Sequence, residues 1–310
     1  MNKYECALAS ISVDNAAHLV AKEVCRKLRQ HHIQVVLPSR DPSHSTDLLS
    51  KDLAKTDVVS GVLADAKLVT DFCKTDRIDG IKDEMMADYD VEISTKAVSM
   101  SDTRMNLVHD YVEAALKQHD FVLTVQRNAK YQEYYQERTQ KKKDELNVMF
   151  AHFHEQNMWT KFKMLTSKLC VLFKQVQTVC SRADFPLTAY VLLVQALKND
   201  VCRGLDDEFE DIFGRGSKEE IMSMIEERFN MDGADPAGRK VGLLDRMHLM
   251  CFIVDPYSHE WRSKFKLEEN MSVIVNEMIE QYIPLGRDTD ATRQRVRKEF
   301  MVRIRIIVLF

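Results

Sequence analysis

Residues that interrupt regular secondary structure are scarce throughout this chain. Only 9 glycines and 6 prolines occur in 310 residues, against average usages of about 7% and 5%. Sandwiches and barrels built from many strands need turn-forming residues at short intervals, whereas long helices do not. The 16 methionines also favour helices. The chain is therefore predicted to be mostly α-helical.

The first forty residues follow a different pattern. Apolar residues alternate over 7–13, recur at helical spacing over 17–28, and form a short run over 33–37. A period of two is typical of a strand, so we expect one strand–helix–strand (βαβ) unit with parallel strands.

From about His44 onward the apolar spacing is helical. Residues 58–73 predict a helix that begins at Thr56-Asp57, and residues 162–180 predict the clearest helix of the chain. A further helix is predicted from Val108, with a polar stretch that can extend it to about Asn147.

Composition excludes several classes of protein. With 44 basic and 48 acidic residues the net charge is −4, so the whole chain is not a polycation. The longest apolar runs, 189–194 and 249–254, fall far short of the roughly 18 residues of a membrane-spanning helix. Seven scattered cysteines without a Cys-x-x-Cys pair support neither a disulfide framework nor a zinc ribbon. We expect a nuclear or cytoplasmic protein that is not secreted and has no membrane contact.

Asp14 is the one acid placed as an active-site carboxylate would be, at the end of the first predicted strand. A two-metal phosphoryl-transfer site needs further acids to hold ions about 4 Å apart. The alternative is that Asp14 or Asn15 caps the following helix. No cofactor is expected, and Mg²⁺ or Mn²⁺ would bind only if other residues completed the site.

A basic cluster with interleaved aromatic rings lies in the middle of the chain. Its members are Arg127, Lys130, Lys141, Lys142 and Lys143, with Tyr131, Tyr134 and Tyr135 between them. This mixture suits nucleic-acid backbone and bases, and its alternative is a solvated helix face. The tail from Ile304 to Phe310 is apolar and β-prone, which favours contact with a protein partner or self-association.

The order of several short motifs resembles that of hAT-family transposases. In that family a strand ends in an Asp-Asn pair that carries the second acid of the DDE triad, which Asp14 and Asn15 match. A Cys-x-x-His-x-x-Asn-Leu-type motif follows the next strand. His44 and Leu48 match it, whereas Asp41 and Asp47 stand in the Cys and Asn places.

Later motifs continue the resemblance. Thr103 and Arg104 are similar to the start of the family's Thr-Arg-Trp motif, with Met105 in the Trp place. Arg228 is similar to the Arg of an Arg-Trp pair. The residues that match the family's "Leu-His … Leu-Asn-Pro" stretch are His248, Asp255 and Pro256. The resemblance also adds Arg104 to the nucleic-acid contacts.

The resemblance implies a short N-terminal βαβ remnant of an RNase H-like fold followed by a large helical insertion domain. The implied parts are a partial α/β segment over 1–43, the helical insertion over 44–283, and a basic then apolar tail over 284–310. Only Asp14 of the triad maps onto this sequence, so we expect a truncated, degenerate and catalytically inactive chain.

The predicted function is therefore that of a transposase-derived protein that binds DNA or another protein. Two alternatives stay open. The chain can be part of an active DDE-type transposase or nuclease that missing sequence or a partner chain completes, or it can be an all-helical interaction scaffold.

Overall fold

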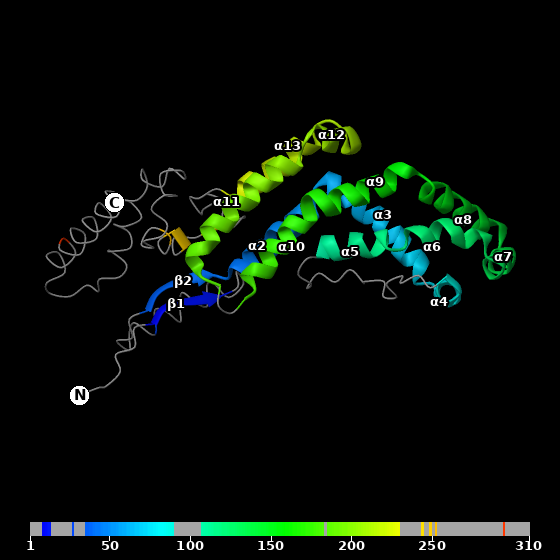
Figure 1. Ribbon diagram of the computed structural model, residues 1–310, viewed down its shortest axis with the longest axis horizontal. Helices are drawn as coiled ribbons and strands as arrows, with labels where there is room; N and C mark the ends of the chain where they lie inside the picture. The colour runs from blue at the N-terminus through cyan, green and yellow to red at the C-terminus, as the bar shows by residue number, and fades with distance from the viewer. Residues whose placement is uncertain are drawn as a thin grey trace. The chain divides into compact units, whose positions relative to one another are not determined.

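The computed structural model describes residues 8–13, 27, 35–89, 107–182, 185–229, 243–244, 248–249, 252 and 294. The elements along the chain are β1(Leu8–Val13), β2(Val35–Arg40), α2(Pro42–Leu53), α3(Asp57–Cys73), α4(Asp76–Tyr89), α5(Leu107–Leu116), α6(His119–Thr124), η1(Val125–Arg127), α7(Ala129–Gln136), α8(Gln140–Phe153), α9(Gln156–Leu165), η2(Thr166–Cys170), α10(Val171–Cys180), α11(Leu187–Gly204), α12(Asp207–Phe213) and α13(Ser217–Phe229) (Figure 1). None of the described helices combines the length and the apolar character needed to cross a bilayer.

The chain packs as two compact units, each made from segments that are distant in sequence. The strand unit comprises Met1–Thr46, Thr178–Ala196 and Glu227–Phe310, and the helical unit comprises Asp47–Gln177 and Leu197–Glu226. The domain boundaries predicted after residues 43 and 283 stay a prediction.

The strand unit holds β1 and β2, which pair in parallel with Leu8 opposite Val35 and Val13 opposite Arg40. The described residues add no third strand to this pair. The expected βαβ remnant of an RNase H-like fold is therefore wrong, because the described chain is otherwise helical and shows no sheet of that class. Alternating apolar residues predict extended backbone locally, and a two-stranded ladder alone does not define a fold. The expectation of a mostly α chain agrees with the structure.

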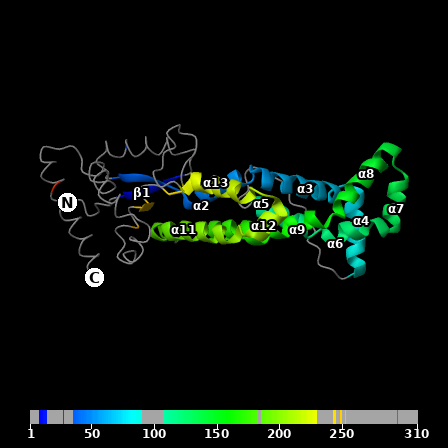
Figure 2. The same ribbon diagram turned by 90° about the horizontal axis from the view of Figure 1, so that it is seen from above.

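In the helical unit, α3 packs against α5 and α9 (Figures 1 and 2). The helix predicted from Thr56 is confirmed: the Thr56 hydroxyl caps α3 by accepting the Val59 N–H at 3.3 Å. Its buried face is formed by residues three or four positions apart, which gives the apolar stripe of a core-facing helix. The members of this face are Val59, Val62, Leu63, Ala66, Val69, Thr70, Phe72 and Cys73.

Aromatic rings from α3, α7 and α8 pack against one another at one end of the helical unit. The ring of Phe72 lies 5.2 Å from that of Phe150 and 6.5 Å from that of Tyr131, in edge-on geometry. Phe150 and Tyr131 are themselves 5.5 Å apart. Edge-on pairs at this spacing stabilise a core beyond simple burial, so α7 and α8 are fixed to α3 by this cluster.

The predicted helix over 162–180 is confirmed as part of a longer run, in which α9, η2 and α10 follow one another without a break. Its middle segment, η2, is a π-helical turn. Such turns insert one extra residue and change which side chains face the core. The helix predicted from Val108 does not extend to Asn147, because α5, α6, η1, α7 and α8 divide that stretch.

Candidate functional site

Several residues singled out from the sequence lie outside the described part of the chain. They are Asp14, Asn15, Thr103, Arg104, Asp255 and Pro256, together with the tail from Ile304 to Phe310. The vestigial catalytic and metal-binding role of Asp14 therefore stays a prediction.

The motif with His44 and Leu48 forms the first turns of α2, where both residues are partly buried. Asp41 precedes the helix, and its Oδ1 accepts the Ser43 N–H at 2.9 Å. Asp47 pairs with Lys51 one turn later, with 2.8 Å between Oδ2 and Nζ. Both of these acids thus stabilise the helix itself.

Two further motif residues, Arg228 and His248, are buried in the strand unit. The main-chain oxygen of Arg228 accepts the Leu243 N–H at 2.8 Å. The His248 ring lies 4.8 Å from the ring of Tyr190. These contacts are packing and backbone contacts of a core.

The tyrosines of the basic cluster are largely part of the aromatic core. Tyr131 and Tyr134 are 2% and 5% exposed, and burial raises the pKa of the Tyr131 phenol. Tyr135 is partly buried, and its hydroxyl contacts Asn147 Oδ1 at 3.0 Å. Stacking on bases requires an exposed ring face, so Tyr131 and Tyr134 cannot form the base-stacking platform suggested by the sequence.

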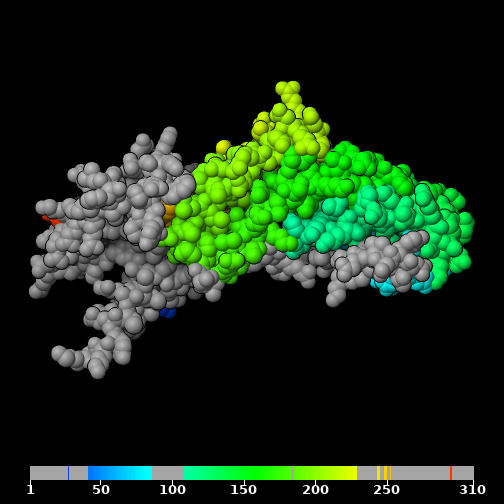
Figure 3. Space-filling view, viewed as in Figure 1, coloured from blue at the N-terminus to red at the C-terminus, as the bar shows by residue number. Residues whose placement is uncertain are grey.

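The cationic side chains of the cluster are at the surface, and most of them have partners. Lys130 pairs with Glu84. Lys142 Nζ lies 2.8 Å from Glu145 Oε2, and Lys143 Nζ lies 5.5 Å from the Tyr135 ring centre. Arg127 and Lys141 are exposed and make no hydrogen bond or ion pair among the described residues, although the charge of Lys141 contributes to lowering the pKa of Glu145. Figure 3 shows the green end of the helical unit, to which α7 and α8 belong, open to solvent in this view.

The start of α8 concentrates positive charge. Thr139 is its N-cap, and the first turn contains Lys141, Lys142 and Lys143 without any acid. A helix N-terminus carries a partial charge of about +0.5 from its free N–H groups. Lysines at this end oppose the helix dipole, but an anion placed there is attracted by both the side chains and the backbone.

A second polar cluster, which sequence reasoning missed, is formed by the buried His109 with Asp110 and Glu113 on α5. One ligand-type atom from each lies within 4.8 Å of the others, as a metal site would require. Lys174 of α10 already places its Nζ 3.0 Å from Asp110 Oδ1 and 3.2 Å from His109 Nδ1. An ion would have to displace this ammonium, so the cluster is balanced by a cation of the chain itself.

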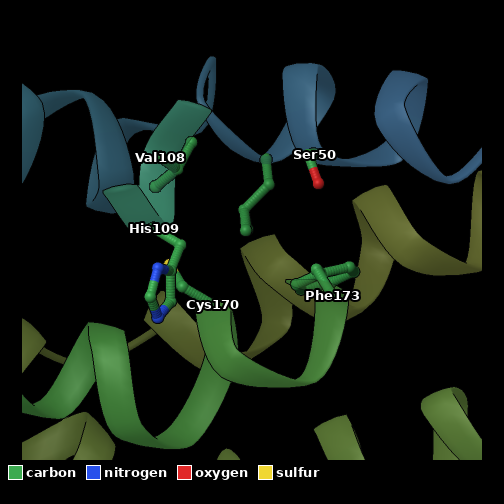
Figure 4. Close-up of a pocket in the computed structure, with 6 residues that line it drawn as sticks. Ser50, Val108, His109, Cys170 and Phe173 are labelled. Carbon is green, nitrogen blue, oxygen red and sulfur yellow. The ribbon is translucent and has the colours of Figure 1, made fainter. Parts of the chain in front are cut away.

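His109 also borders a small cavity between α2, α5 and the η2–α10 run. Its volume of about 10 Å³ is enough for about one water molecule. Figure 4 shows Ser50, Val108, His109, Cys170 and Phe173 around it. Burial raises the pKa of the Cys170 thiol to about 12, so this thiol stays protonated and is a poor nucleophile.

The sequence carried one signal for the His109 cluster, since positions 109 and 113 share a helix face. Lys174 is 65 residues from His109, and no local pattern connects them. Comparison with known proteins adds nothing to these sites, because no family model, no curated protein and no solved structure matches the chain.

Proposed function

We propose that this chain is a transposase-derived protein of the hAT type that lacks catalytic activity of its own and binds DNA through the start of α8. The observation that carries the proposal is the first turn of α8, where three consecutive lysines coincide with the positive end of the helix. The order of the sequence motifs supplies the link to transposases. DNA phosphates are the polyanion that such a site attracts.

The three lysines contribute differently. Lys141 is exposed and makes no hydrogen bond or ion pair within the described ranges. Lys142 is held by Glu145, and this hydrogen bond lowers the pKa of the Glu145 carboxyl. Lys143 is partly buried, and its Nζ lies 3.3 Å from Gln136 Oε1. A phosphate must therefore compete with these partners, so we expect binding that is weak, independent of DNA sequence and sensitive to salt.

The test is binding of a labelled DNA duplex across a salt series from about 50 to about 200 mM. If three phosphates are neutralised at this site, the triple variant Lys141→Ala, Lys142→Ala, Lys143→Ala should lose about three units of the slope of log affinity against log salt. Its affinity at low salt should fall as well.

A matched control removes three lysine charges from positions outside α8. Lys55, Lys67 and Lys163 are all exposed in the helical unit, and their triple alanine variant should retain the salt slope. An equal loss in both variants would show a general charge effect. No retention by the parent chain would exclude DNA binding and favour the interaction scaffold. Strand cleavage with Mg²⁺ or Mn²⁺, abolished by Asp14→Ala, would instead establish the active-enzyme alternative.

A further inference from the structure

His152, in the last turn of α8, lies between two carboxylates from different parts of the helical unit. Its Nε2 is 2.9 Å from Oδ1 of Asp65 on α3. Its Nδ1 is 3.3 Å from Oε2 of Glu155, which follows α8. A neutral imidazole has one N–H, whereas the imidazolium has two. Only the imidazolium has a proton on each ring nitrogen, so placing a carboxylate beside both nitrogens favours the protonated ring.

The charges around the ring have one sign. Asp65 is the charged group that faces His152 from α3, and Glu155 is the one that faces it from the start of α9. In the described ranges neither acid pairs with another cation. The His152 and Asp65 side chains are 32% and 29% exposed, so solvent screens their attraction less than that of a fully exposed pair.

Glu155 has a second place available to it. It occupies the N-cap position of α9 with extended backbone, but its side chain makes no capping hydrogen bond. Acids near a helix N-terminus are stabilised by the free N–H groups there. The His152 ring and the free N–H groups at the N-terminus of α9 thus compete for the Glu155 carboxylate. The charge of the ring decides which of the two the carboxylate contacts.

We propose that His152, Asp65 and Glu155 form a proton-dependent latch that holds the end of α8 and the start of α9 to α3. The latch is closed when the ring is protonated. When the proton is lost, one carboxylate faces a nitrogen lone pair, and Glu155 is released toward the N-terminus of α9. This inference is independent of DNA binding.

The direction of the pH effect follows from linkage. The hydrogen bond to Asp65, followed by further contributions from Asp65 and Glu155 against the effect of burial, raises the pKa of His152. A raised pKa in the folded state means that the latch stabilises the fold fully below the unfolded value of about 6.5. This stabilisation is lost as the pH rises through the folded value.

The experiment follows the His152 ring signal by NMR between about pH 5 and about pH 9, in the full parent chain and in Asp65→Asn. In the parent chain the His152 midpoint should lie above the unfolded value of about 6.5, because the ring lies 2.9 Å from Asp65. Asp65→Asn should shift this midpoint downward. A parent midpoint at or below the unfolded value, or no shift in Asp65→Asn, would overturn the latch.

A second measurement keeps the test independent of ring assignments. Amide exchange at the α8–α9 junction, corrected for the intrinsic pH dependence, should rise between about pH 6 and about pH 8. His152→Gln should show the faster exchange at both pH values, whereas His154→Gln should behave as the parent chain. A parent chain whose exchange is unchanged across this range would contradict the proposal.

Discussion

The main-chain oxygen of Lys168 lies so close to the α-carbon of Gly204 that a Cβ added to Gly204 would be 2.7 Å from it. Lys168 belongs to the π-helical turn η2, and Gly204 is the last residue of α11. Backbone cannot move aside as a flexible side chain can. The close approach of these two helices therefore requires a residue without a side chain at position 204.

Gly204→Ala should destabilise the helical unit by about 1–3 kcal/mol, the usual range for overpacking a well-packed site. Gly61→Ala is the matched control, because Gly61 is exposed within α3 and a Cβ there meets nothing within 4 Å. The control should stabilise the fold by about 0.5–1 kcal/mol through higher helix propensity. Urea unfolding measures both. The same sign for both variants would contradict the role of the close approach.

The free energy of unfolding should decrease at acid pH, because the carboxylates that pair with Lys168 become protonated. Its Nζ lies 2.6 Å from Asp206 Oδ2 and 2.7 Å from Glu208 Oε2, and the first of these hydrogen bonds lowers the pKa of Asp206. A lowered carboxyl pKa gives stability above the unfolded value of about 3.9, which is lost as the pH falls through the folded value. In Lys168→Met the loss of stability at acid pH should be smaller than in the parent chain. Lys163→Met, the control, should show the same dependence of stability on pH as the parent chain. Thermal unfolding at several pH values measures all three proteins.

The buried thiols should resist alkylation in the folded chain. Burial raises the pKa values of Cys73 and Cys170 to about 12, so near pH 8 these thiols stay protonated. Cys202 is exposed. After brief treatment with iodoacetamide, peptide mass spectrometry should find Cys202 modified, and Cys73 and Cys170 unmodified. Treatment in urea should modify all three, and native labelling of Cys170 at the rate of Cys202 would refute the prediction.

Trp159→Phe should destabilise the helical unit by about 1–3 kcal/mol, because it leaves a buried acceptor without its donor. The indole N–H of Trp159 donates to the Phe153 oxygen at 2.7 Å, and both residues are fully buried. Thr160→Val is the control, since this hydroxyl bonds to Gln156 O at the surface. Its effect on chemical denaturation should stay within about 0.5 kcal/mol. Equal effects of the two substitutions would contradict the structural role of the indole.

Local patterns predicted the helices with the strongest apolar periodicity. The cap at Thr56 and the helical run over 162–180 were found in this way, because their signals lie within a few residues. The RNase H-like remnant, which the family resemblance implied, was wrong, since short alternating segments indicate extended backbone without showing the sheet around it. The division of 108–147 into several helices was also missed, because a polar stretch carries little periodicity.

Local sequence also predicted only part of the candidate sites. Sequence alone identified the lysines at the start of α8, but it also assigned Tyr131 to a nucleic-acid surface. The ring of Tyr131 is instead buried against Phe72, which is 59 positions earlier in the chain. The pairing of Lys174 with His109 and the position of His152 beside Asp65 likewise join distant segments.

The helical character of this chain and the places where charge gathers along it can be predicted from the residues alone, because helix propensity, capping and charge are properties of neighbouring residues. Which tyrosines are buried, which lysines are paired and where a glycine is required became known from the fold. These outcomes depend on contacts between helices, and such contacts form between residues that no local pattern relates.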